Sequence, residues 1–274
     1  MKTSKQNIKL ILFSLLLFSG CEKEINIDLN NSNPIIVIEG NVSNVLGNSM
    51  VRISKTLDFD ENVVYPSVSK AFITIKDSTL NRIDTLTESI TIPGTYSNPE
   101  IIGEVGHTYV LKVRIDGQIY SSTSTMPIGL TLDSIVQENL AGTSGDLGPP
   151  ESLPDAGTII QIRPYYVNPH LSDEYYQYVV KRNEKFLNNI IPREELSSSG
   201  FSLNLPLFIK AKKDDVIQVD MQFIEKKVYY YLYGVSQNYG QYSATPSNPE
   251  PNISNGALGY FKAHTSQNKV LIIR

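Results

Sequence analysis

The residues best suited to catalysis or metal binding are few and far apart in this sequence. The three histidines and the single cysteine are His107, His170, His264 and Cys21. No two histidines have the spacing of a zinc site or of a Ser-His-Asp arrangement, and one cysteine cannot build a disulfide framework or a thiolate cluster. We therefore expect no enzyme, no resident metal and no other cofactor.

One acidic segment has the beginning of a calcium loop. Asp58, Asp60 and Asn62 stand at alternate positions. An EF-hand also needs glycine at its sixth position and a bidentate glutamate at its twelfth, where this sequence has Val63 and Ser69. A solvated acidic loop is therefore favoured over a specific Ca²⁺ site. Phosphate loops, nucleophile elbows and dinucleotide fingerprints do not occur in the sequence.

The first twenty residues are typical of a lipoprotein signal peptide. Three lysines precede an apolar run over residues 10–18, after which small residues lead to Cys21. The run is too short to span a bilayer. The alternative is an N-terminal core helix followed by a chance cysteine. We predict cleavage of residues 1–20, lipidation of Cys21 with acyl chains such as palmitate, and a lipidated tether over residues 21–34.

Cleavage at this point makes the chain clearly acidic. Removal of three lysines from the 24 Lys and Arg leaves 21 against 28 Asp and Glu, a net charge of −7. Without a block of basic residues, this balance gives no electrostatic basis for nucleic-acid binding. Diacylglycerol and a further acyl chain on Cys21 would exceed the two signals that stable anchoring needs. Glu22 replaces the aspartate typical of inner-membrane retention, and residues 22–24 resemble the signals of surface-exported lipoproteins in Bacteroidota, so an outer-membrane protein facing the cell surface is expected.

The sequence after the tether predicts a mainly β fold. Short β-branched runs, several of them alternating with period two, occupy residues 35–42, 50–53, 71–76, 108–115 and 119–121. Asp116–Gly117, between the last two runs, is a strong hairpin signal because a type I′ turn needs positive φ at both central positions. With no helical period between the runs, residues 35–128 are predicted to form an immunoglobulin-like antiparallel β-sandwich.

Residues 129–274 are predicted to form a second β-rich domain with one short helix. The strands are expected over residues 132–136, 159–166, 175–180, 201–209, 216–224 and 270–273. The Gly- and Pro-rich segment 137–157 is expected to be a long exposed loop and the first site of proteolysis. Residues 226–242 combine apolar residues at helical spacing with a run of tyrosines that would also suit a strand, and a helix is favoured.

Tyrosine is the unusual feature of the composition, since most of the sixteen tyrosines lie in the second half and the chain has no tryptophan. Tyr229, Tyr230, Tyr231 and Tyr233 cannot all face one core, so some of them must be exposed. They belong either to the rim of a core or to a protein interface, and the exposed members are our candidates for partner binding. The absence of tryptophan weakens, without removing, a glycan-binding interpretation.

Several short motifs, in their order along the chain, together resemble the domain of unknown function 4249 family. They are the lipobox at Cys21 and residues 22–29, 36–40, 106–113, 116–120 with Met126–Pro127, 132–134, 248–255 and 256–261. Members of that family resemble Bacteroidota outer-membrane lipoproteins, often encoded next to a TonB-dependent receptor. The resemblance implies a location and a partner, and it transfers no catalytic residues.

The expected protein is a non-enzymatic outer-membrane lipoprotein that assists a TonB-dependent transporter in substrate capture or assembly. The alternative is a free-standing surface adhesin or glycan-binding protein, and a third possibility is a hydrolase whose site forms only in three dimensions. The Asn- and Pro-rich segment 248–255 has either a structural role, as a turn-rich loop before a closing strand, or a binding role.

Overall fold

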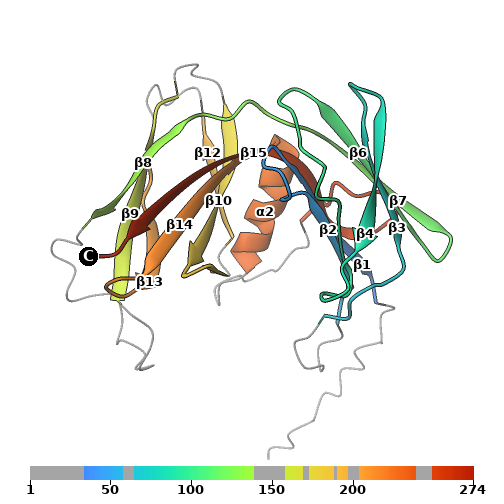
Figure 1. Cartoon of the computed structure of the whole chain (residues 1–274), viewed down its shortest axis with the longest axis horizontal. Coiled ribbons are helices and arrows are strands. Elements are labelled where there is room, and N and C mark those ends of the chain that lie inside the picture. The colour runs from blue at the N-terminus through green and yellow to red at the C-terminus, as the bar shows by residue number, and fades with distance from the viewer. Residues whose placement is uncertain are drawn as a thin grey trace, which may run out of the picture. The chain divides into compact units, whose positions relative to one another are not determined.

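The described residues form a mainly β fold with one helix in the second half, as the sequence predicts (Figure 1). The structure is a computed structural model that describes residues 34–57, 65–138, 158–168, 173–187, 190–196, 204–238 and 249–274. The elements in chain order are β1 (Ile36–Ser43), β2 (Met50–Lys55), β3 (Phe72–Asp77), β4 (Arg82–Glu88), β5 (Thr95–Ser97), β6 (Thr108–Ile115), β7 (Gln118–Thr125), β8 (Leu132–Glu138), β9 (Thr158–Tyr166), β10 (Glu174–Arg182), β11 (Lys185–Phe186), β12 (Ile191–Glu195), β13 (Leu207–Ala211), β14 (Val216–Phe223), α2 (Lys226–Asn238) and β15 (Leu258–Ile272).

Some of the sequence predictions fall outside the described residues. They are those for Cys21 with the signal peptide, for Asp58, Asp60 and Asn62, for His170, and for most of the 137–157 loop. The first two residues of that loop lie in β8, which extends to Glu138. Lipidation at Cys21 stays a prediction.

The first half is an immunoglobulin-like β-sandwich. One sheet has the strand order β1–β2–β5 and the other β4–β3–β6–β7, and a short β4–β5 pairing joins them. Alternate side chains of each strand point between the sheets, so that Ile38, Ile73, Ile75, Leu111 and Val113 are almost completely buried in one core. The sandwich therefore arises from the period-two pattern that the sequence displays.

The predicted β6–β7 hairpin is confirmed. Asp116 and Gly117 have φ of 48° and 82°, and Ile115 pairs with Gln118. Positive φ at both positions is the type I′ geometry whose twist matches that of the flanking strands.

The second half has two further sheet regions, which enclose a core of their own. The order β13–β9–β8 forms a separate three-stranded sheet, while β10, β11, β12 and β14 extend the long sheet beyond β15. A hydrogen bond of 2.7 Å between the hydroxyls of Tyr166 in β9 and Tyr176 in β10 crosses the core, and Tyr166 also donates to the buried Glu195 carboxylate at 2.5 Å. These three buried polar side chains thus satisfy one another.

Helix α2 confirms the helical interpretation of residues 226–242 as far as Asn238; residues 239–242 lie outside the described ranges. Val228, Tyr229 and Leu232 are buried against Tyr175 and Ile224, forming a small third cluster. Among the described residues, no helix has the length and the apolar character that crossing a bilayer requires.

The largest difference from the predicted strands concerns β15. The sequence suggests only residues 270–273, but the strand has 15 residues and begins at Leu258. It pairs in parallel with β1 over residues 258–264 and antiparallel with β14 over residues 265–272. Residues 261–265 are all buried, so the first part of the strand lacks the alternation by which a half-exposed strand is recognised.

Strand β15 also connects the two halves. Phe261 and Ala263 are buried in the first core, whereas Ile273, next to the strand's end, is buried in the second. Residues 34–274 accordingly form one compact unit.

The predicted strand over residues 201–209 is wrong in its boundaries. Residues 201–203 lie outside the described ranges, and β13 begins only at Leu207 and continues to Ala211. Asn204 has a φ of 45°, and Pro206 lacks an N–H group, so these residues cannot join a regular ladder.

Candidate functional site

The four tyrosines singled out from the sequence lie on α2, and the helical period separates them. Tyr230 and Tyr233 are 52% and 45% exposed, whereas Tyr229 is 4% exposed and belongs to the small core cluster. Tyr231 is half-buried, with its ring 5.7 Å from that of Tyr260 in β15. Of these four tyrosines, Tyr230 and Tyr233 therefore offer broad surfaces to a partner. Tyr229 instead packs in the small core cluster that holds the helix.

A groove of about 650 Å³ lies beside these exposed rings, and we call it the α2 groove. It is formed by α2, by residues 249–254 and by one edge of β7. The lining residues are Ser121, Thr123, Lys227, Tyr230, Tyr231, Tyr233, Gly234, Pro249, Glu250, Pro251, Asn252, Ile253 and Ser254. The groove thus combines parts of the chain that are more than a hundred residues apart in sequence.

Hydrogen bonds hold the 249–254 wall firmly in place. Three hydrogen bonds join Ser254 and Ser121: the Ser254 N–H donates to the Ser121 carbonyl and the Ser121 N–H to the Ser254 hydroxyl, both at 2.8 Å, and the two hydroxyls lie 3.0 Å apart. The Asn252 side chain donates to the carbonyl of Phe261 at 2.7 Å and accepts its N–H at 2.8 Å. Asn252 therefore mimics a strand partner for β15, which gives the Asn- and Pro-rich segment a structural role in addition to its place in the groove.

Close packing fixes α2 against the same wall. A Cβ atom added to Gly234 would lie 2.7 Å from the Cβ of Pro249, which is closer than real side chains approach. Glycine in a helix interior costs about 1 kcal/mol relative to alanine. The close contact between the helix and Pro249 offers a physical reason for a glycine at position 234.

The aromatic rings of α2 support one another. The Tyr229 ring lies 5.3 Å from the rings of Tyr175 and Tyr230 and 5.8 Å from that of Tyr233, distances typical of favourable aromatic pairs. The Lys226 ammonium lies 5.6 Å from the Tyr175 ring and 5.8 Å from the Tyr230 ring. Tyr230 and Tyr233 are therefore held in place before any partner arrives.

The electrostatics keep this cluster in one charge state near neutral pH. Burial raises the pKa of Tyr229 to about 12, with a smaller contribution from the charge of Glu194. The hydrogen bond with Tyr175 raises the pKa of Lys226 above its usual value. The Tyr229 hydroxyl is therefore neutral and the Lys226 ammonium is charged at physiological pH.

The charged residues in the described lining of the groove are Lys227 and Glu250. In the part of the chain that the structure describes, no three His, Cys, Asp or Glu side chains come together as a metal-binding group. His107 lies in the sandwich, where its Nδ1 is 2.8 Å from Asp77, and His264 is buried in β15, where burial holds its pKa well below the usual range.

The fold and the groove together define a class, that of a β-sandwich protein with an aromatic groove whose walls are held by hydrogen bonds and close packing. The chain belongs to the family described as Domain of unknown function (DUF4249), which matches it over residues 22–269. This match confirms the resemblance drawn from the sequence motifs. No curated protein matches the chain.

Two solved structures show distant similarity. The FN1–FN3 domains of chicken CNTN1 share 12% identity, with 68% of this chain and 59% of that chain covered and a TM-score of 0.25. The selenomethionine-substituted chicken interferon gamma receptor alpha chain shares 13% identity, with 70% and 91% covered and a TM-score of 0.19. Scores this low carry no argument about this chain.

The sequence did not predict that the 249–254 wall lies beside α2. Residues 248–255 stood out as a motif, but nothing in their composition shows that Pro249 packs against Gly234 or that Ser254 bonds to Ser121. A glycine inside an otherwise helical segment was the one local signal of a close approach at this point of the helix.

Proposed function

We propose that this chain is a non-enzymatic lipoprotein, anchored to the outer membrane through Cys21, whose α2 groove binds a segment of a TonB-dependent transporter and so assists substrate capture or assembly. The observation that supports this function best is the pair of exposed rings, Tyr230 and Tyr233, beside a groove with fixed walls. The class of partner comes from the family resemblance.

The chemistry of the groove favours a protein segment as its occupant. Tyrosine offers a large contact area at a low cost in conformational entropy, and interfaces are enriched in it. The prolines and serines of the 249–254 wall add rigid apolar surface and hydroxyl groups, while Lys227 and Glu250 are opposite charges. An extended peptide of low net charge fits this lining better than a strongly ionic ligand does.

Lipid anchoring would make a weak contact sufficient. A tether confines the protein near the membrane, so its partner is met at an effective concentration far above that in solution. We expect Cys21→Ala to abolish incorporation of labelled fatty acid and to move the protein from the membrane fraction to the soluble fraction. The measurement is intact mass and fractionation. An unlipidated wild-type chain of unprocessed mass would contradict the anchor.

The groove is tested by a double variant, Tyr230→Ala with Tyr233→Ala. Truncation of central aromatic residues at an interface typically costs about 2 kcal/mol or more, so we expect roughly a tenfold or greater loss of the receptor that co-purifies from membranes after crosslinking in intact cells. The thermal unfolding midpoint should stay close to that of wild type, because both rings are half-exposed.

The matched control is Tyr65→Ala, which removes a tyrosine that is 55% exposed and lies in the first half of the chain. This variant should recover as much receptor as wild type. Equal losses from both variants, or no receptor captured by wild type, would contradict the proposal. Binding of glycan or host protein without a receptor would favour an adhesin instead.

A further inference from the structure

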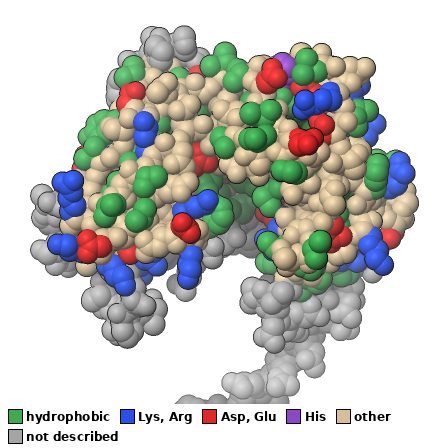
Figure 2. All heavy atoms as spheres, in the orientation of Figure 1, with side chains coloured by type: hydrophobic (Ala, Val, Ile, Leu, Met, Phe, Trp, Pro, Cys, Tyr) green, Lys and Arg blue, Asp and Glu red, His purple; other side chains and the backbone are tan. Residues whose placement is uncertain are grey.

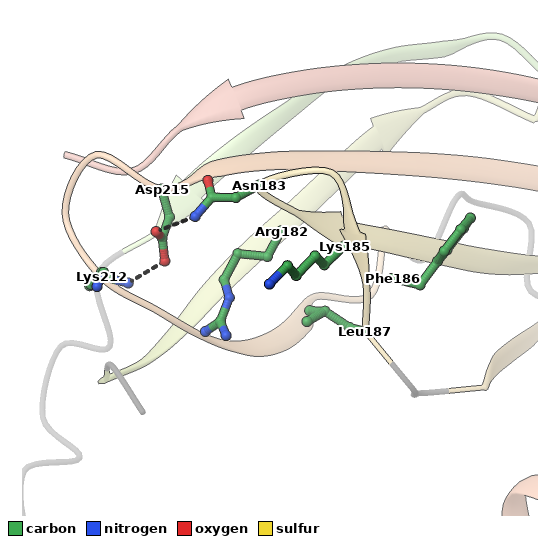
Figure 3. A pocket seen from close by; sticks show the side chains of 7 residues that line it. All are labelled: Arg182, Asn183, Lys185, Phe186, Leu187, Lys212 and Asp215. Atoms are coloured by element: carbon green, nitrogen blue, oxygen red, sulfur yellow. Dashed lines mark hydrogen bonds between the residues drawn. The ribbon is translucent and has the colours of Figure 1, made fainter. Parts of the chain in front are cut away.

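A second concave site lies in the other part of the β-rich half. It is a pocket of about 360 Å³ between the β10–β11 hairpin and the β13–β14 turn, and it shares no lining residue with the α2 groove. Arg182, Lys185 and Leu187 point toward the same space from the hairpin, with Lys212 and Asp215 on the opposite side (Figure 3). In Figure 2, Lys and Arg side chains gather at this end of the described surface, near β13 and β14 of Figure 1.

The two hairpin cations are direct neighbours across the strands. Arg182 in β10 is the register partner of Lys185 in β11. The turn residues between them, Asn183 and Glu184, have φ of 49° and 66°, the type I′ geometry of a tight two-residue hairpin. Like charges directly opposite each other destabilise a strand pair, so this arrangement costs stability unless an anion lies between them.

Among the described residues, Asp215 is the carboxylate whose charge reaches Arg182, but it forms no direct ion pair with that side chain. Arg182 Nη1 donates to the carbonyl of Lys210 at 2.8 Å, and its other N–H groups and the Lys185 ammonium have no hydrogen-bond partner in the described ranges. No described carboxylate lies within 4.0 Å of either cation.

Asp215, the one carboxylate among the described lining residues, is already engaged. Asp215 accepts the backbone N–H of Lys212 at 3.0 Å and the side-chain amide of Asn183 at 2.8 Å. These two bonds, the first above all, hold the pKa of Asp215 below its usual value, so it stays ionised. One oxygen joins the hairpin to the turn through Asn183, and the other closes the turn itself through Lys212, so these bonds fix the position of the hairpin and its cations.

We propose that this pocket binds a phosphate group between the Arg182 guanidinium and the Lys185 ammonium. The two cations that face each other across the hairpin, Arg182 and Lys185, carry two positive charges, which matches a phosphate monoester dianion. The guanidinium presents a planar fork that fits two phosphate oxygens, and the ammonium adds a mobile point charge. Leu187 gives the pocket an apolar wall, which lowers the local dielectric and strengthens the contact.

The test is a phosphate titration of the purified full chain at constant ionic strength, with chloride replacing phosphate in the reference. We expect phosphate to raise the thermal unfolding midpoint of wild type beyond chloride, and calorimetry to report a saturable site. The double variant Arg182→Gln with Lys185→Gln should bind phosphate at least roughly tenfold more weakly, because both cationic donors to the phosphate oxygens are lost. Its midpoint in chloride should equal or exceed that of wild type, since a like-charge pair has been removed.

The control variant is Lys210→Gln with Lys213→Gln, which removes the same charge from residues that do not line the pocket. It should keep the phosphate response of wild type. Vesicles of phosphatidylglycerol, compared with phosphatidylcholine, identify the source: binding of the vesicles as well as the free ion indicates a lipid phosphate, and binding of the free ion alone indicates a soluble ester. No shift beyond chloride, or an equal shift in the Arg182 and Lys185 variant, overturns the proposal.

Discussion

Replacing Gly259 by alanine is expected to unfold the protein or to lower its stability drastically. Gly259 has a φ of 101°, and it pairs with Ile38 at the parallel β1–β15 junction. A Cβ atom at this position would lie 2.0 Å from the Ile38 carbonyl oxygen and 2.7 Å from its carbonyl carbon, so backbone would have to move. Strained backbone of this kind costs about 1–3 kcal/mol before the clash is counted.

The consequence should extend through both cores, because β15 contributes to each of them. We expect the free energy of unfolding of Gly259→Ala, measured with urea and circular dichroism, to fall by more than about 3 kcal/mol, a large part of a typical domain's stability. Gly256→Ala is the matched control. It also has a positive φ, of 77°, but an added Cβ would meet nothing within 4 Å, and its cost should stay near about 1 kcal/mol. Similar stabilities of the two variants would contradict the role given to Gly259.

Sequence reasoning succeeded where one local pattern determines the structure. The alternation in β3 and β6 exists because one face of each strand is buried, and the Asp116–Gly117 turn follows from backbone geometry alone. The helix at residue 226 onward could be recognised by apolar residues that recur at helical spacing. These features depend on neighbours within a few residues.

Prediction from the sequence failed where contacts between distant residues determine the structure. Strand β4 has one buried residue, Leu86, and β5 is three residues long, so neither has a pattern of its own. In β15 the buried residues include Lys262, His264 and Thr265, which a pattern of hydrophobicity cannot identify as core. Their burial depends on partners supplied by other strands of the sheet.

In the candidate site, too, the local features could be predicted from the sequence and the long-range contacts could not. The run of tyrosines was visible, and so was the conclusion that some of its members are exposed. Which ones are exposed depends on the helix orientation, which is fixed when Val228 and Leu232 pack against Ile224. The groove required Ser121 and Ser254, which lie 133 residues apart, to meet at one edge of β7. The spacing of these residues in the sequence does not predict this contact.

Lys262 is the most unusual of the buried polar residues of β15. Its ammonium donates to the Gln222 side-chain oxygen at 2.6 Å, and that oxygen also accepts from Gln177 at 2.7 Å. Gln222 in turn donates to Asp220 at 2.7 Å, so among the described residues the cation is linked to a carboxylate through an amide and not by a direct ion pair. Burial lowers the pKa of Lys262 to about 8, against the partly opposing charges of Asp220 and Glu39.

This lowered pKa predicts an unusual dependence of stability on pH. Between about 8 and the ordinary value of 10.5, the unfolded chain holds a proton at Lys262 that the folded chain has released. Raising the pH therefore favours the folded state in this window, and the cost of burying the charge, fully present below about 8, disappears above 10.5. Relative to Lys262→Met, the free energy of unfolding of wild type should rise by about 2 kcal/mol from about pH 7 to about pH 9.5.

The comparison with Lys262→Met is needed because buried tyrosines act in the opposite direction. Burial raises the pKa of Tyr176 to about 12 and that of Tyr166 further, so above the ordinary value of 10.0 the unfolded chain loses protons that the folded chain keeps. Stability is then lost as pH rises, equally in both proteins, and the difference between them isolates the lysine. Lys112→Met, which removes an exposed lysine, should follow the wild type in the same urea titrations. A difference between wild type and Lys262→Met that does not change with pH would show that Lys262 is not buried as a charge.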